Sequence, residues 1–154
     1  MKTLTKLSLV AIAALSSALT QAAVTSASIP LSLTVAKQCT ISDVAANIVI
    51  PTDASKGTGT FTVTCNAQSY TLVITTANTR NPATFVYTSN PTHILNTQIS
   101  VDTQGMIVPV NSGALSKLAL SSDIYNVNVA LINPISQTTP AGVYSDTLNI
   151  TVDY

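Results

Sequence analysis

The stretch PAGVYSDTLNITVDY, residues 140–154, closes the sequence and decides how the rest of it is interpreted. Five of its large side chains fall on one face of an extended chain: Tyr144, Leu148, Ile150, Val152 and Tyr154. A period of two residues is typical of a β-strand with one buried face, so we expect a strand over Val143–Tyr154. If this core strand ends with the chain, one of its edges lacks a neighbour, and exposed edges of this kind recruit other strands.

Working back from this strand, short alternating segments recur about every ten residues and are separated by Gly, Pro and Asn. Charged residues make up only 8% of the chain, and Thr, Ser, Val, Ile and Asn take their place, which favours pleated, half-buried strands. We therefore expect an all-β, immunoglobulin-like sandwich with Greek-key connections. The further strands expected are Ala27–Val35, Cys39–Ile41, Thr60–Cys65, Tyr70–Thr76, Thr84–Tyr87, Ile94–Val101, Gly105–Val110, Leu115–Leu120 and Ile124–Ile132. Loops are expected at Thr52–Gly59, Asn78–Pro82 and Asn133–Gly142.

The start of the chain has the pattern of a secretory signal peptide over residues 1–22. Lys2 and Lys6 precede an apolar run, and small residues follow at the expected cleavage site after Ala22. The run is too short to span a bilayer, which needs roughly 20 apolar residues, and no later stretch qualifies. We expect an exported product of one domain, with no membrane insertion once the signal is removed.

Charge and cysteine content exclude several classes of function. Beyond residue 22 only four basic residues remain, too few for a nucleic-acid surface. Cys39 and Cys65 are the two cysteines of the chain, and a pair in an exported protein predicts a structural disulfide. A metal site would need more ligands than the single His93 adds.

Catalysis is not expected, because the chain has few groups that could carry it. His93 with Asp102 and a serine could be imagined as a triad, but one histidine and no glutamate leave little for acid–base work. The aspartates are dispersed, and no calcium loop or glycine-rich phosphate loop occurs. The sequence predicts no enzyme, no cofactor and no metal.

The closing segment, with its core Ala-Gly-x-Tyr-x-Asp-Thr at residues 141–147, resembles the last strand of chaperone–usher pilus subunits. It is most similar to that of the spore coat protein U–like pilins of the archaic pathway. The stretch Ala23–Ile41, whose alternating residues lead to Cys39, resembles the start of such subunits, and Cys65 falls where the disulfide partner would be. The two regions cover about a quarter of the chain that follows the signal.

This resemblance implies a sandwich that lacks its last strand and is completed by donor-strand exchange. Residues 23–35 would be a donor extension inserted into the next subunit, and residues 36–154 the pilin domain. The inserted side chains would be Ala27, at the rim, and Ile29, Leu31, Leu33 and Val35. One wall of the receiving groove would be lined by Leu148, Ile150 and Val152. Pro30 departs from the pattern, because a proline inside an inserted strand cannot donate a ladder hydrogen bond.

The same resemblance implies the partners and the location. The chain would bind copies of itself or related pilins, a periplasmic chaperone and an outer-membrane usher. It would then reach the cell surface as part of a fimbria that serves adhesion or biofilm formation.

Two other hypotheses stay open at this point. A pilus-borne adhesin could contact a host receptor through tyrosines such as Tyr70, Tyr87 and Tyr125. A monomeric secreted module, for example for carbohydrate, would be a complete sandwich whose first strand is Val24–Val35. The absence of tryptophan counts against a sugar-binding face.

Overall fold

The structure is a computed structural model that describes residues 25–80, 83–88, 90, 92–118 and 122–154. The expected signal peptide, residues 1–22, lies outside the described residues. The chain divides into two compact units, Met1–Thr34 and Val35–Tyr154. The described residues contain no α-helix, and so no helix that is long and apolar enough to cross a membrane.

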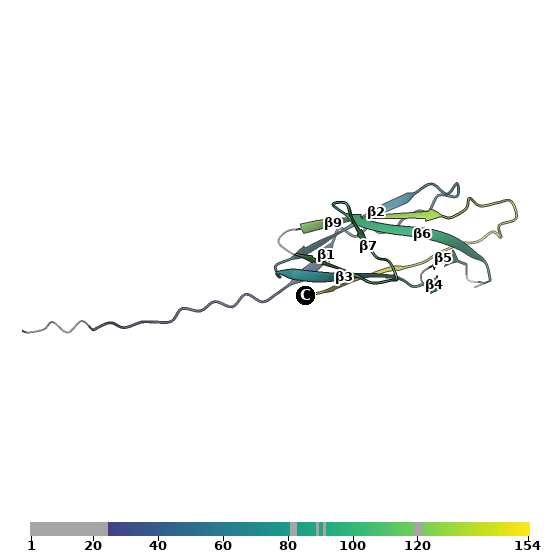
Figure 1. Cartoon of the computed structure of the whole chain (residues 1–154). Coiled ribbons are helices and arrows are strands. Elements are labelled where there is room, and N and C mark those ends of the chain that lie inside the picture. Colours follow the sequence, from purple (N-terminus) through teal and green to yellow (C-terminus); the bar gives the residue numbers. More distant parts are fainter. Residues whose placement is uncertain (1–24, 81–82, 89, 91, 119–121) are drawn as a thin grey trace, which may run out of the picture. The chain divides into compact units, whose positions relative to one another are not determined.

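The unit Val35–Tyr154 is a sandwich of two antiparallel sheets, so the all-β prediction is confirmed. Figure 1 shows β6 and β9 in one layer and β3 in the other. The larger sheet has the order β1-β2-β9-β6-β5-β4, with β7 also paired to β6, and the smaller has the order β10-β3-β8. The strands of the larger sheet are β1 (Cys39–Ser42), β2 (Gly57–Cys65), β4 (Thr79–Arg80), β5 (Ala83–Tyr87), β6 (Ile94–Thr103), β7 (Met106–Val108) and β9 (Ser122–Leu131). Those of the smaller sheet are β3 (Ser69–Thr76), β8 (Ala114–Leu118) and β10 (Leu148–Asp153).

Alternation along the strands places one face of each sheet in the core. Every second residue is buried on β9, and also on β2 apart from the half-buried Gly59. The ring of Phe61 stacks on that of Tyr125 with centroids 4.8 Å apart. The inner face of β3 meets them from the smaller sheet through Tyr70, Leu72 and Ile74. The core is thus built from aromatic and branched side chains that suit a pleated surface.

The predicted disulfide joins Cys39 on β1 to Cys65 on β2, which are paired residues of the ladder. It closes a loop of 26 residues between the first two strands. Cross-links of this span stabilise domains by roughly 3–4 kcal/mol in the chain-entropy model.

Four expectations about local structure are wrong. Residues 27–35 form no strand, because no described residue pairs with them. The last strand begins only at Leu148, since the chain before it pairs with β5 instead. The expected loop Thr52–Gly59 ends early, because Gly57–Gly59 already pair with β9. Within the expected turn Asn78–Pro82, Thr79 and Arg80 pair with β5 as β4.

Candidate functional site: an apolar groove along the last strand

An apolar groove of about 820 Å³ runs between β10 and residues 44–50, at the seam where the first and last parts of the sandwich meet. Leu148 and Ile150 line it from β10, while Ile48 and Ile50 line it from the opposite wall. Its floor is made by core side chains of the larger sheet, among them Phe61, Val127 and Val129. Val152, the third residue expected in the wall, packs against the core but is not part of the groove lining.

Within the part of the chain that the structure describes, β10 has one backbone edge that no strand pairs with. The amide of Ala77 donates to the carbonyl of Thr147 at 2.9 Å, which shows that odd-numbered residues of this segment direct their backbone groups to β3. Backbone groups alternate in direction along a strand, so those of Leu148, Ile150 and Val152 point away from β3. No strand of the described residues pairs with that edge. The three residues therefore offer both apolar side chains and free hydrogen-bonding groups.

The opposite wall, residues 44–50, lies along β2 without forming a strand. It is fixed by a hydrogen bond from the amide of Ala45 to the carbonyl of Thr60 at 2.9 Å. Gly57 and Gly59 allow this close approach, because a Cβ at Gly57 would overlap the carbonyl oxygen of Val49, and one at Gly59 would overlap the side chain of Ile48. The glycines of β2 thus position the second wall.

The groove is also lined by residues 141–147, the Ala-Gly-x-Tyr-x-Asp-Thr core of the closing segment. Here the chain crosses between the sheets: Ser145 exchanges backbone hydrogen bonds with Tyr87 of β5, and Thr147 accepts from Ala77 next to β3. Asp146 stabilises the crossing, since its Oδ1 accepts from the amides of Asn78 at 2.9 Å and Thr147 at 2.7 Å. The most specific part of the closing segment therefore builds a corner and delivers β10 to the groove.

The carboxylate of Asp146 gives this corner a pH dependence. Burial raises the pKa of Asp146, although backbone hydrogen bonds from Thr147, Asn78 and Ala77 act in the opposite direction. Its Oδ2 has no hydrogen-bond partner among the described residues. A raised pKa means that the folded state holds the proton more tightly. The contribution of Asp146 to the unfolding free energy is therefore full below the ordinary value of 3.8 and is lost as pH rises through the raised pKa.

We expect Asp146→Asn to show this by comparison with the wild-type chain in urea unfolding at pH 7 and pH 4. The wild-type advantage in unfolding free energy should grow on acidification, because Asn cannot take up the proton. Asp53→Asn is the matched control with the reverse trend, since hydrogen bonds from Ser55 lower the pKa of Asp53. A wild-type advantage over Asp146→Asn that shrinks at pH 4 would contradict the assignment.

Residues 25–34, described by themselves, are extended and exposed. The side chains of Ile29, Leu31 and Leu33 are 84%, 94% and 89% exposed, and Val35 just beyond them is 71% exposed. Ala27, expected at the rim of the inserted set, is also exposed. Large aliphatic side chains in an alternating row are seldom left in water, and such exposure marks an interaction surface.

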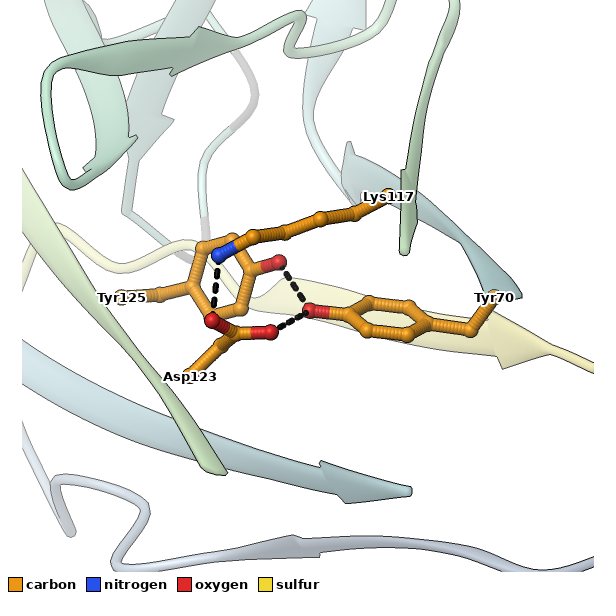
Figure 2. A network of polar contacts seen from close by, with 4 residues as sticks. All are labelled: Tyr70, Lys117, Asp123 and Tyr125. Carbon is orange, nitrogen blue, oxygen red and sulfur yellow. Dashed lines mark hydrogen bonds and ion pairs between the residues drawn. The ribbon is translucent and has the colours of Figure 1, made fainter. Parts of the chain in front are cut away.

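A second cluster, shown in Figure 2, lies between the two sheets. The hydroxyl of Tyr70 on β3 meets Asp123 Oδ2 at 2.8 Å and the hydroxyl of Tyr125 on β9, while Lys117 Nζ of β8 forms an ion pair with Asp123 Oδ1. Tyr70, Tyr125 and Asp123 are at most 2% exposed. Burial raises the pKa of both tyrosines, so their hydroxyls stay protonated at neutral pH. This cluster ties the sheets together and offers no surface to a ligand.

Sequence reasoning missed this cluster, because it treated the aspartates, Asp123 among them, as dispersed along the chain. The alternating pattern of β9, in which Asp123 shares the inward parity of Tyr125, was the available signal. The same burial removes Tyr70 and Tyr125 from any receptor surface, so that part of the adhesin hypothesis is wrong.

The residues considered for catalysis are not brought together. His93 precedes β6, and Asp102 lies near its other end, roughly 30 Å away along a strand that rises about 3.3 Å per residue. Asp102 instead accepts from the side-chain amides of Asn126 at 3.2 Å and Asn128 at 3.4 Å. Among the described residues, no three His, Cys, Asp or Glu side chains are grouped as metal ligands.

The fold has counterparts among solved structures. One is a chain of the CsuC–CsuE chaperone–tip adhesion subunit pre-assembly complex from the archaic chaperone–usher Csu pili of Acinetobacter baumannii. It has a TM-score of 0.54 and 16% identity, over 79% of this chain and 40% of that one. A second belongs to a chaperone–tip adhesin complex of CFA/I fimbriae biogenesis, with a TM-score of 0.47 and 17% identity, over 75% of this chain and 42% of that one.

The first likeness shows a fold shared with a chain of a complex from an archaic chaperone–usher pilus system. The present chain spans about two fifths of the length of each of these two chains. No protein-family model and no curated protein matches the sequence.

Proposed function

We propose that this chain is a structural subunit of a bacterial surface pilus whose subunits join by donor-strand exchange. Residues 27–35 of one subunit fill the groove between β10 and residues 44–50 of the next. The observation that carries the proposal is the backbone edge of β10, which borders an apolar groove and pairs with no strand of the described residues. The exposed, alternating aliphatic residues of the stretch 27–35 supply a segment of matching chemistry.

Two kinds of complementarity support the exchange. Leu148, Ile150 and Val152 direct unpaired amide and carbonyl groups outward, which an incoming strand can bond. The aliphatic side chains of residues 29–35 can enter a groove lined mainly by Val, Ile, Leu and Ala. In strand addition, main-chain hydrogen bonds give affinity and pockets for alternate side chains give specificity.

The open groove also accounts for the proposed helper proteins. Before assembly, its apolar lining and the edge of β10 would invite aggregation, so a partner has to cover them. A periplasmic chaperone fills this role after export by the general secretory route, and an outer-membrane usher replaces it by the next subunit. The fold likeness to a chain of a chaperone–subunit complex supports this assignment. The resulting fimbria serves adhesion or biofilm formation at the cell surface.

Deleting residues 25–35 is expected to remove polymerisation and leave the sandwich folded. The full-length and deleted genes are expressed in the native host, and unheated cell-surface extracts are separated in SDS. The full chain should give a ladder of oligomers that collapses on boiling, and the deleted chain a single short species with an intact Cys39–Cys65 disulfide. An unchanged ladder from the deleted chain would eliminate the proposal, and a monomer from the full chain would favour the secreted binding module.

A further inference from the structure

Pro30 interrupts the very segment that the proposed function inserts into the groove, and the structure indicates why it is tolerated there. The inference rests on the proposed function and concerns the direction of the inserted strand. Its starting point is the backbone of β10, where the side chains of Leu148, Ile150 and Val152 face inward and their amides and carbonyls face the edge away from β3. Inward side chains and edge-directed backbone groups thus belong to the same residues of β10.

The hydrogen bonds of β3 support this assignment of backbone directions along β10. Residues of β3 that pair with Asn149 and Thr151 are Thr75 and Val73. Ile74, between them, directs its carbonyl the other way and accepts from the amide of Asn111 at 2.9 Å. Alternate residues of β3 therefore bond to opposite neighbours, as a regular antiparallel ladder requires.

Because the inward residues of β10 are also those whose backbone groups face the open edge, an antiparallel and a parallel donor strand would bond to β10 through different residues. In an antiparallel pair, opposite residues share a face and also share the direction of their backbone groups. Inward residues of the donor, such as Leu31 and Leu33, would then bond to β10. The amides of outward residues, Ser28 and Ser32, would point to the other flank together with the nitrogen of Pro30.

In a parallel pair the relation is reversed. A residue whose backbone groups face its neighbour lies beside one whose groups face away. The outward residues would then have to bond to β10, and Pro30, which has no N–H, would leave one carbonyl of β10 without a donor. Its ring carbon would also occupy the space of the missing hydrogen bond.

The other flank tolerates a proline, because residues 44–50 form no strand in the structure. The amide of Ala45 is already bonded to Thr60 of β2, so this wall offers side chains rather than a regular ladder. We propose that Pro30 is a direction selector: it permits the donor strand only antiparallel to β10, with its imide nitrogen toward residues 44–50.

N-methylation tests this without changing a side chain, because it removes one backbone N–H at a chosen residue. Three fluorescent peptides with the sequence of residues 25–37 are titrated against the purified full chain: unmodified, N-methylated at Ser32, and N-methylated at Leu33. The methyl group at Ser32 points where the ring carbon of Pro30 already points. We therefore expect its dissociation constant to stay within about threefold of the unmodified peptide, and that of the Leu33 peptide to rise about tenfold or more.

The other outcomes are decisive as well. If N-methylation at Ser32 weakened peptide binding and N-methylation at Leu33 did not, the antiparallel direction of the donor strand would be overturned. The proposed function would still stand. If N-methylation weakened peptide binding equally at both positions, or did not weaken it at either, the donor backbone would not be bonded to β10 alone. Either result would overturn the role of Pro30. Failure of the unmodified peptide to bind would remove the proposed function and the inference with it.

Discussion

Aspartate at both Leu31 and Leu33 is expected to abolish the ladder of SDS-resistant oligomers while leaving the subunit folded. Each leucine that enters the groove contributes roughly 1.5–3 kcal/mol by burial, and both contributions are lost. Each carboxylate that enters instead costs several kcal/mol more, since the described groove lining offers it no cation. With 1.4 kcal/mol for each factor of ten, association should weaken at least a hundredfold, by this order-of-magnitude count. The measurement is the oligomer distribution in unheated extracts.

The matched control carries the same two charges on the outward face, as Ser32→Asp and Thr34→Asp. These residues share the exposed segment but alternate with the inserted set, so the control should still polymerise. Equal unfolding free energies of the two double variants would show that the sandwich is intact in both. If the control lost its ladder as fully as the leucine variant, the inserted face would be wrongly assigned.

Asp123→Ala is expected to lower the unfolding free energy of the domain by about 3–5 kcal/mol, the range for breaking a buried ion pair. Asp123 is the carboxylate partner of Lys117 and also accepts from Tyr70, and the side chains of the ion pair are only 12% and 3% exposed. Removing it leaves an ammonium group in the core without a counter-charge. Since small domains are stable by only about 5–15 kcal/mol, this is a large fraction of the total. Urea unfolding of the purified subunit is the measurement.

Two further variants make the result specific. Asp153→Ala removes an exposed carboxylate of β10 and should change stability by less than about 0.5 kcal/mol. The pair Asp123→Leu with Lys117→Met replaces both charges by apolar groups and should recover most of the loss, because desolvation of the two charges then no longer has to be offset. A loss below about 1 kcal/mol in Asp123→Ala would contradict the role of the cluster shown in Figure 2.

The sequence predicted those parts of the fold whose pattern lies within one short segment. Alternation in Phe61–Cys65 and Tyr70–Thr76 predicts strands that the structure contains, because the pleat itself decides which side chains are buried. The disulfide was equally accessible, since only two cysteines follow the expected signal.

Long-range pairing was beyond the sequence. Nothing local in Val143–Thr147 shows that Ser145 pairs with Tyr87, and the late start of β10 follows from that contact. Gly57 and Gly59 suggested a loop, whereas their missing side chains make room for Ile48 and Val49. The ion pair of Lys117 and Asp123 joins different sheets, so residue spacing could not reveal it.

The central claim is that the groove beside β10 holds residues 27–35 of a neighbouring subunit, and site-directed photo-crosslinking of assembled fibres tests it most directly. A photoreactive leucine analogue replaces Leu33 in chains of normal isotope content, which are assembled together with heavy-isotope chains and irradiated. Mass spectrometry should then find links between light and heavy chains that join residue 33 to residues 148–152 or 44–50. Links confined to one chain, or to residues of a neighbour outside the groove, would contradict the claim.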